Sequence, residues 1–184
     1  MKGVPMFYNQ QIIPAIPNHQ ALKKFIESGY TYGILMNFQL AQLKLLVDAC
    51  HKANKKVLIH SELIKGLSHD EFGAIYLIQE LQVDGLISSK PKVIELCKKR
   101  NVIGIFRFFL KDSISLEQSL AITKKIEPVY LEVLPAAGTR LIQFIKDQVN
   151  AEILMGGLIQ NKEQIQQCIS SGAIAVTTSN TNLW

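Results

Sequence analysis

Two short segments near the end of the sequence carry residue types that suit anion binding. Met155–Ile159 contains a Gly-Gly pair, Val176–Asn180 contains Thr-Thr-Ser, and each follows an apolar run. Glycines let main-chain N–H groups approach an anion closely, and a helix that begins there adds partial positive charge. Such segments on adjacent strands form the phosphate site found after the last two strands of many (β/α) barrels. We therefore expect a small phosphorylated ligand at Gly156, Gly157, Thr177, Thr178 and Ser179.

A second group of polar side chains interrupts apolar, strand-like runs. His60 and Glu62 end one run, Arg107 lies within a second and Glu132 within a third. Residues two apart in a strand share a face, so His60 and Glu62 are expected on the same side. Carboxylates there can accept hydroxyl protons, and Arg107 can balance their charge. The residues expected to contact ligand hydroxyls, or to support those contacts, are Asn37, His60, Glu62, Lys65, Arg107 and Glu132.

The same residues allow other interpretations. Arg107 could pair with Glu132 or Glu62 in a buried structural network, which is compatible with a ligand site above it. Glu62, Glu132 and His60 could instead be the acid and base of a phosphosugar isomerase or lyase. No lysine lies within an apolar strand to form a Schiff base, although Lys90, just past a strand, is a possible exception. A catalytically inactive barrel that binds other proteins is a third possibility.

Composition and cysteine spacing restrict the class of protein. The chain has 184 residues, is 48% hydrophobic and carries a formal net charge of +5, which suits an anionic ligand or nucleic acid without being diagnostic. Cys50, Cys97 and Cys168 lie far apart without CxxC spacing, which predicts reduced core thiols. No metal-ligand spacing, signal peptide or membrane-spanning run is visible, so we expect a cytoplasmic protein without metal or membrane attachment.

Short β-rich runs alternate with amphipathic helical runs along the whole chain, which predicts an α/β fold. Eight such strands predict a single compact (β/α) TIM-type barrel over residues 1–184. Because full barrels usually need about 250 residues, we expect short loops and no full last helix. The expected strands are Gln11–Ile16, Tyr32–Asn37, Lys56–Glu62, Gly85–Ser89, Val102–Phe109, Val129–Leu134, Glu152–Gly157 and Ala173–Ser179.

Helix ends are marked by capping residues. Ser68 with Glu71 forms a capping-box pattern, and Asn161 with Gln164 repeats it. The loop Leu63–Leu67, which contains Lys65 and a glycine, could be a lid over the ligand or a plain surface loop. Residues expected in the left-handed conformation after helices are Gly29, Asn54, Asn101 and Gly172.

Several of these segments together resemble the glycerol-3-phosphate-responsive antiterminator family. The resemblance runs from Ile13 to Trp184, and its third-strand block and Thr-Thr-Ser ending are more particular than its Gly-Gly pair. The segments that carry it are Ile59–Leu67, Asp84–Ser89, Glu132–Pro135, Gly156–Ile159, Ala175–Ser179 and Leu183-Trp184. Family members more often have Asp at the position of Glu62, and Gly at that of Ala136.

The resemblance implies a regulator and not a catalyst. Such proteins sense sn-glycerol 3-phosphate and act on the leader mRNA of glycerol-utilisation genes, preventing termination and stabilising the transcript. Here Gly156, Gly157, Thr178 and Ser179 would hold the phosphate, with Glu62 and Glu132 near the glycerol hydroxyls. No catalytic residue and no cofactor is expected, and a homo-oligomer remains possible.

No RNA-binding sequence motif is visible, but basic residues cluster at the ends of the expected helices. In a barrel these ends lie on the face opposite the ligand, so the residues would form what we call the basic rim. Cations at helix C-termini also interact favourably with the helix dipole, by about 0.3–1 kcal/mol each, so the clusters have a structural explanation as well. The basic rim expected to contact RNA phosphates consists of Lys55, Lys56, Lys98, Lys99, Arg100, Lys124 and Lys125, with Lys146 late in the sixth helix on the same face.

Overall fold

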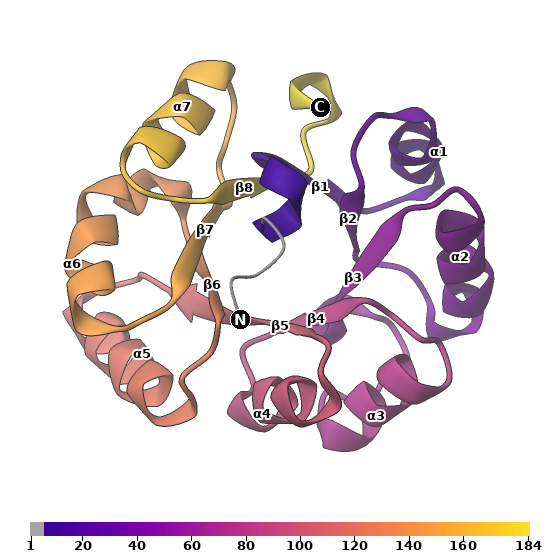
Figure 1. The fold of residues 1–184 in the computed structure, drawn as a ribbon, viewed down its shortest axis with the longest axis horizontal. Helices are drawn as coiled ribbons and strands as arrows, with labels where there is room; N and C mark the ends of the chain where they lie inside the picture. Colours follow the sequence, from indigo (N-terminus) through magenta and orange to yellow (C-terminus); the bar gives the residue numbers. More distant parts are fainter. Residues whose placement is uncertain (1–5) are drawn as a thin grey trace.

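The computed structural model describes residues 6–184, which form a closed barrel of eight parallel strands with helices around it (Figure 1). Neighbouring strands pair in sequence order, and β1 closes the barrel against β8. The predicted α/β TIM-type fold is confirmed. The strands are β1 Ile12–Ile16, β2 Tyr32–Leu35, β3 Lys56–His60, β4 Gly85–Ser88, β5 Ile103–Phe109, β6 Tyr130–Leu134, β7 Glu152–Gly156 and β8 Ala175–Thr178.

Seven α-helices in the described chain cover the outside of the barrel, and four short 3-10 helices lie between or beside the strands. The α-helices are α1 His19–Glu27, α2 Leu40–Lys52, α3 Glu71–Gln79, α4 Pro91–Arg100, α5 Ser113–Ile126, α6 Ile142–Gln148 and α7 Lys162–Ser170. The 3-10 helices are η1 Met6–Asn9, η2 Ser61–Leu63, η3 Ala136–Leu141 and η4 Thr181–Leu183. None of the described helices is long and apolar enough to span a membrane.

The strands are mostly apolar because both of their faces are buried, and most of their polar residues lie toward the ends. One face of each strand packs under the helices, and the other fills the barrel interior. Ile34, Leu58, Ile105 and Leu154, from alternate positions of four strands, belong to one buried interior cluster and are 0–2% exposed. This packed centre separates the two ends of the barrel, so the polar groups at each end form separate sites.

The amino end of the barrel is closed by η1, which lies over its centre in Figure 1. Phe7 is 4% exposed, and its ring lies 5.1 Å from that of Tyr32 and 5.2 Å from that of Tyr130. Gln10 fastens this segment to β2: its Nε2 donates to Tyr32 O at 2.7 Å, and its Oε1 accepts from Thr31 N at 2.9 Å. The segment therefore acts as a plug with an apolar tip.

After β8 the described chain continues into η4, and residues 6–184 contain seven α-helices for the eight strands. Trp184 packs against the core between the barrel and its helices. Lys24 of α1 secures this tail, since its Nζ donates to Thr181 O at 2.5 Å and lies 5.9 Å from the Trp184 ring. The C-terminal turn thus fills part of the place that a last helix takes in longer barrels.

The helix ends correct three details of the sequence analysis. The N-cap of α3 is Asp70, whose carboxylate accepts from the N–H groups of Phe72 and Gly73, whereas Ser68 donates its hydroxyl to Asp70. Gly29 is not among the residues with positive φ, because α1 already ends at Ser28 in extended conformation. Asn161 caps α7 as predicted, but the capping box is incomplete because Gln164 Oε1 accepts from Gln160 N and not from Asn161 N. Asn54, Asn101 and Gly172 have positive φ, as predicted.

Candidate functional site

A cavity of about 170 Å3 lies at the carboxyl end of the barrel. The predicted residues that line it come from five strands or the loops that follow them. They are His60, Arg107, Glu132, Gly157, Thr177, Thr178 and Ser179. Met36, Leu63, Leu134 and Leu158 add an apolar wall that the sequence analysis missed, because strand-end loops give no periodic signal.

Arg107 and Glu132 form a buried ion pair at the base of this cavity. They are paired in register on β5 and β6, and Arg107 Nε lies 2.9 Å from Glu132 Oε2. Thr177 of β8 donates its hydroxyl to the other carboxylate oxygen of Glu132 at 2.7 Å. A carboxylate that is 4% exposed has to be compensated in this way. Of the two partners that the sequence allowed for Arg107, the structure selects Glu132.

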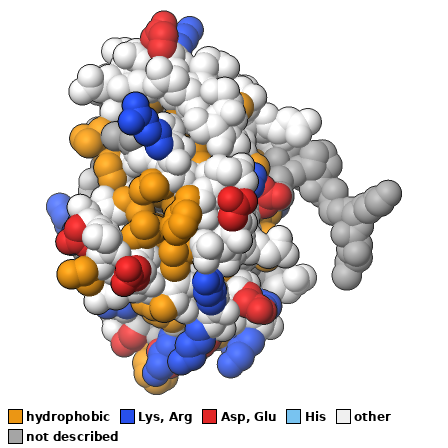
Figure 2. Space-filling model, turned by 90° about the vertical axis from the view of Figure 1, so that its left-hand side faces the viewer, with side chains coloured by type: hydrophobic (Ala, Val, Ile, Leu, Met, Phe, Trp, Pro, Cys, Tyr) orange, Lys and Arg blue, Asp and Glu red, His pale blue; other side chains and the backbone are white. Residues whose placement is uncertain are grey.

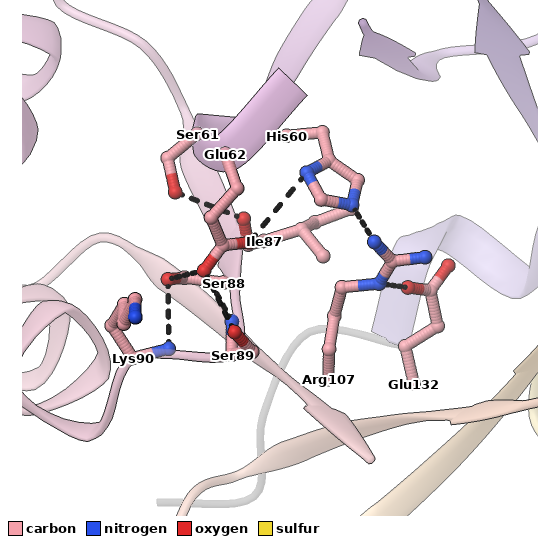
Figure 3. Close-up of polar contacts among 9 residues, drawn as sticks. All are labelled: His60, Ser61, Glu62, Ile87, Ser88, Ser89, Lys90, Arg107 and Glu132. Atoms are coloured by element: carbon pink, nitrogen blue, oxygen red, sulfur yellow. Dashed lines mark hydrogen bonds and ion pairs between the residues drawn. The ribbon is translucent and has the colours of Figure 1, made fainter. Parts of the chain in front are cut away.

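His60, the last residue of β3, contacts the same arginine, because Arg107 Nη1 donates to His60 Nε2 (Figure 3). Arginine can only donate, so Nε2 accepts and the imidazole is neutral with its proton on Nδ1. Burial, reinforced by the positive charge of Arg107, lowers the pKa of His60 to about 3. The histidine is therefore an uncharged part of the site at neutral pH.

Glu62 occupies a different position from the one predicted. Strand β3 ends at His60, and Glu62 lies in η2, so the two residues do not share a strand face. Its Oε1 accepts from Ser88 Oγ at 2.8 Å, Ser89 N at 2.8 Å and Ser89 Oγ at 3.0 Å (Figure 3). Its Oε2 lies 3.8 Å from His60 Nδ1. Glu62 thus holds the end of β4 and lies behind the lining of the cavity.

Asn37 and Lys65 are exposed and do not line the cavity. They belong to two loops joined by main-chain bonds: Asn37 N donates to Leu63 O, Lys65 N to Phe38 O and Leu40 N to Lys65 O, each at 2.9 Å. These bonds fix the loop after η2 to the loop after β2. Of the two alternatives for Leu63–Leu67, they favour a fixed surface loop over a lid.

The ends of β7 and β8 have the features expected of an anion site. A side chain at Gly156 would collide with the Thr177 hydroxyl, and Gly157 adopts a φ of +75°, which favours glycine. Leu158 follows with a φ of 61° and is 73% exposed. Within residues 6–184, the main-chain N–H groups of Gly157, Leu158 and Ser179 donate to no other protein group. Successive free N–H groups in such a turn are a concavity suited to an anion.

The residues of the basic rim, at the opposite end of the barrel, differ in whether their charged groups contact other parts of the fold. Lys55 is 8% exposed and donates to Ser28 O and Tyr30 O, and Lys56 pairs with Asp84 at 2.9 Å. Lys55 therefore holds loops of the fold, whereas Lys56 is 47% exposed and has its charge paired. Lys146 is half-buried, and the remaining predicted rim residues are exposed: Lys98, Lys99, Arg100, Lys124 and Lys125.

Within the described residues, no group of three or more histidine, cysteine or acidic side chains could hold a metal ion. The three cysteines are buried and free. Burial raises the pKa of Cys50 to about 11 and that of Cys97 to about 12, so these thiols are protonated and unreactive at neutral pH.

The fold and the site define a (β/α) barrel with a polar cavity at the carboxyl ends of its strands, where barrels of this class place their ligand or active sites. Within this class, the model of the glycerol-3-phosphate responsive antiterminator family matches residues 12–184. The chain belongs to that family, which is one of regulators and not of enzymes.

Three similar proteins match the chain over more than nine tenths of its length. The crystal structure of the glycerol uptake operon antiterminator regulatory protein from Listeria monocytogenes is 38% identical, with a TM-score of 0.94, over 98% of this chain and 97% of that one. A glycerol uptake operon antiterminator-related protein from Thermotoga maritima is 21% identical, with a TM-score of 0.81, over 97% and 99% of the two chains, and shows the same fold. The uncharacterized protein YgcP of Escherichia coli is 24% identical over 94% of this chain and 91% of its own.

Proposed function

We propose that the barrel senses sn-glycerol 3-phosphate and binds the leader mRNA of glycerol-utilisation genes in the cytoplasm, where it prevents termination and stabilises the transcript. The observation that carries the ligand assignment is the cavity in which free N–H groups of the β7 and β8 ends face a buried arginine–glutamate pair. The free N–H groups suit a phosphate, and the arginine–glutamate pair suits hydroxyl groups. Membership of an antiterminator family supports the RNA partner.

The proposed roles follow the position of each residue. Gly156, Gly157, Thr177, Thr178 and Ser179 hold the phosphate, with Thr177 also fixing Glu132. Glu132, Arg107 and His60 contact the glycerol hydroxyls, and Glu62 supports them from behind through η2 and β4. Asn37 and Lys65 belong to the outer loops near the cavity. No cofactor takes part in this scheme.

Thermal unfolding with a panel of small phosphates tests the ligand. At a hundred times its dissociation constant, sn-glycerol 3-phosphate should add about 2.7 kcal/mol of stability, which raises Tm by about 5–10 °C. Glycerol alone and inorganic phosphate should give smaller shifts at the same concentration. A larger shift with a different phosphosugar would contradict the assignment, and chemical turnover of the ligand, followed by NMR, would establish an enzyme.

A pair of glycine variants makes this test specific to the phosphate site. Gly157 and Gly172 both have positive φ, +75° and +103°, so an alanine strains the main chain at either position. Only Gly157 lines the cavity. Gly157→Ala should abolish the ligand-induced shift, whereas Gly172→Ala should lower Tm and keep the shift.

Two parts of the proposal concern the partners. A leader transcript from a glycerol-utilisation operon should bind the purified protein in a gel-shift assay, with an affinity that depends on the ligand. We place the RNA at the end of the barrel opposite the ligand, on the exposed part of the basic rim. Association of the chain into a homo-oligomer stays a prediction. Sedimentation velocity, which measures the oligomeric state, tests it.

A further inference from the structure

The amino end of the barrel contains a groove of about 710 Å3 between the C-terminal ends of α4, α5 and α6. Three lysines from these successive helices converge on it: Lys98, Lys124 and Lys146. Pro128 and Val129, which precede β6, form an apolar part of its wall, and Val129 is 58% exposed. Figure 2 shows the side of the molecule formed by α5, α6 and α7, with lysine and arginine side chains gathered at its lower edge.

The charges of the three lysines are not neutralised. Lys124 Nζ donates to Gln148 Oε1 at 3.0 Å and Lys146 Nζ to Gly172 O at 3.1 Å, and both acceptors are uncharged. Within residues 6–184, none of the three lysines forms an ion pair. Glu127 and Glu152 also line the groove and reduce its positive potential in part. A favourable interaction with helix dipoles explains lysines at helix ends, but it does not explain why three of them face one hollow.

The shape of the groove favours a chain-like ligand over a compact one. A second hollow of about 310 Å3 runs from it toward Asn101 and Tyr130. The two hollows share Lys98, Glu127, Pro128 and Val129, so together they form a track along the ends of α4 and α5. Such a track suits a polymer with repeated negative charges.

The groove also offers groups that recognise bases. Single-stranded RNA is bound by basic grooves that follow its phosphates while unstacked bases pack on apolar or aromatic surfaces. The exposed Val129 side chain provides such a surface. The side-chain amides of Gln148 and Asn150, which line the same groove, can donate to and accept from base edges.

We infer that this groove binds a single-stranded segment of the leader RNA through phosphate contacts from Lys98, Lys124 and Lys146, with a base on Val129. The inference rests on the proposed function and narrows its RNA surface from the basic rim to one track. It also connects the two ends of the barrel. Strand β6 begins directly after Val129, which lines the groove, and carries Glu132, which lines the ligand cavity, so the two proposed sites lie at opposite ends of one strand.

The test compares variants that remove the same number of charges from different places. The groove variant is Lys98→Gln/Lys124→Gln/Lys146→Gln. The control, Lys23→Gln/Lys52→Gln/Lys162→Gln, removes three exposed lysines that do not line the groove. Binding of a glycerol-operon leader transcript is measured by fluorescence anisotropy at several salt concentrations. The shift in Tm with sn-glycerol 3-phosphate verifies that each variant is folded and still binds its ligand.

Three lost phosphate contacts should reduce the slope of log affinity against log salt by about 2, which corresponds to roughly 40-fold weaker binding at 0.15 M salt. The control should retain the wild-type slope within about 0.5. Val129→Ser should weaken binding severalfold without changing the slope, since it removes no charge. If the groove variant does not fold without the Lys146 bond, Lys98→Gln/Lys124→Gln should reduce the slope by about 1.4.

Each alternative outcome is decisive. Wild-type RNA affinity in the groove variant, or an equal loss in the control, overturns the assignment to this groove while the proposed function stands. Failure of the wild-type protein to bind the transcript at all contradicts the RNA part of the proposed function itself. A Tm shift with inorganic pyrophosphate that only the groove variant loses, with unchanged RNA binding, would identify the groove as a site for small anions instead.

Discussion

Glu132 is the residue at which the polar groups of the ligand cavity meet. One of its oxygens pairs with Arg107 at 2.9 Å and the other accepts from Thr177 at 2.7 Å. Arg107 in turn contacts His60. Because Glu132 is 4% exposed, losing any of these partners would leave a buried polar group unsatisfied. The four side chains thus form one unit, and the properties of each depend on the others.

Glu132→Gln should destabilise the protein because it leaves the charge of Arg107 buried without a counter-charge. Breaking a buried pair from one side costs about 3 kcal/mol or more. The measurement is the free energy of unfolding in urea at pH 7. Replacing both members, in Arg107→Met/Glu132→Leu, should recover much of the loss, since no charge then stays buried. A double variant less stable than Glu132→Gln would contradict this explanation.

His60 should make stability depend on pH. Its pKa of about 3 in the folded protein, against 6.5 ordinarily, means that between these values the unfolded chain binds a proton that the folded chain does not. Stability is therefore complete above pH 6.5 and falls as the pH decreases toward 3, by about 1.4 kcal/mol per pH unit in mid-range. Urea unfolding between pH 7 and 5 measures this slope. In His60→Asn the slope should be smaller by that amount; equal slopes would show that His60 does not remain neutral.

For single residues, the sequence predicts which type of partner a buried charge needs better than which residue provides it. A cation within an apolar strand needs a counter-charge, so an acidic partner for Arg107 was predictable. Which glutamate pairs with Arg107 depends on strand register and on where β3 ends. Glu132 is in register with Arg107, whereas Glu62 lies beyond the end of β3, in η2, and accepts hydrogen bonds from Ser88 and Ser89. Short-range patterns do not contain that information.

Among the helices, α3 contains a glycine, Gly73, that packing requires although glycine is a poor helix former. Gly73 lies in its first turns, directly against the main-chain carbonyl of Ser68, and an added Cβ would overlap that oxygen. Gly73→Ala should therefore destabilise the protein by about 1–3 kcal/mol although alanine is the better helix former. Gly29→Ala is the matched control, because nothing lies within 4 Å of its Cβ position. Thermal unfolding compares the two variants. Equal Tm values would show that the main chain at Ser68 can move away from the added methyl group without a loss of stability.

All eight strands were predictable because a strand buried on both faces reads as a continuous apolar run. Their ends were predicted up to two residues too long, as at Asn37 and Glu62, because the residues directly after a strand can continue its sequence pattern. The α3 cap was assigned to Ser68 since Ser68 and Glu71 match a capping box. Asp70 lies closer to the helix and competes for the same N–H groups, and local spacing cannot rank the two.

Over the whole molecule, the two ends of the barrel differ in how they are closed. The carboxyl end keeps a cavity with polar groups at its base and an apolar wall, whereas the centre of the amino end is filled by η1 from outside the sheet. No local sequence pattern predicts the role of this segment, because its contacts with Tyr32 and Tyr130 join distant parts of the chain. Between the ends, Ile34, Leu58, Ile105 and Leu154 form a packed interior.

Phe7→Ala should separate stability from ligand binding. Removing a ring that is 4% exposed leaves a cavity under Tyr32 and Tyr130, and such changes cost about 3–5 kcal/mol. The packed interior lies between this cavity and Arg107, so the affinity for sn-glycerol 3-phosphate should stay within about twofold once the lower stability is allowed for. Urea unfolding and isothermal titration calorimetry at 15 °C measure the two quantities, with Phe7→Leu as the smaller change. A large loss of ligand affinity in Phe7→Ala, with folding intact, would mean that the plug and the ligand cavity are mechanically joined, so that the interior transmits changes between the ends.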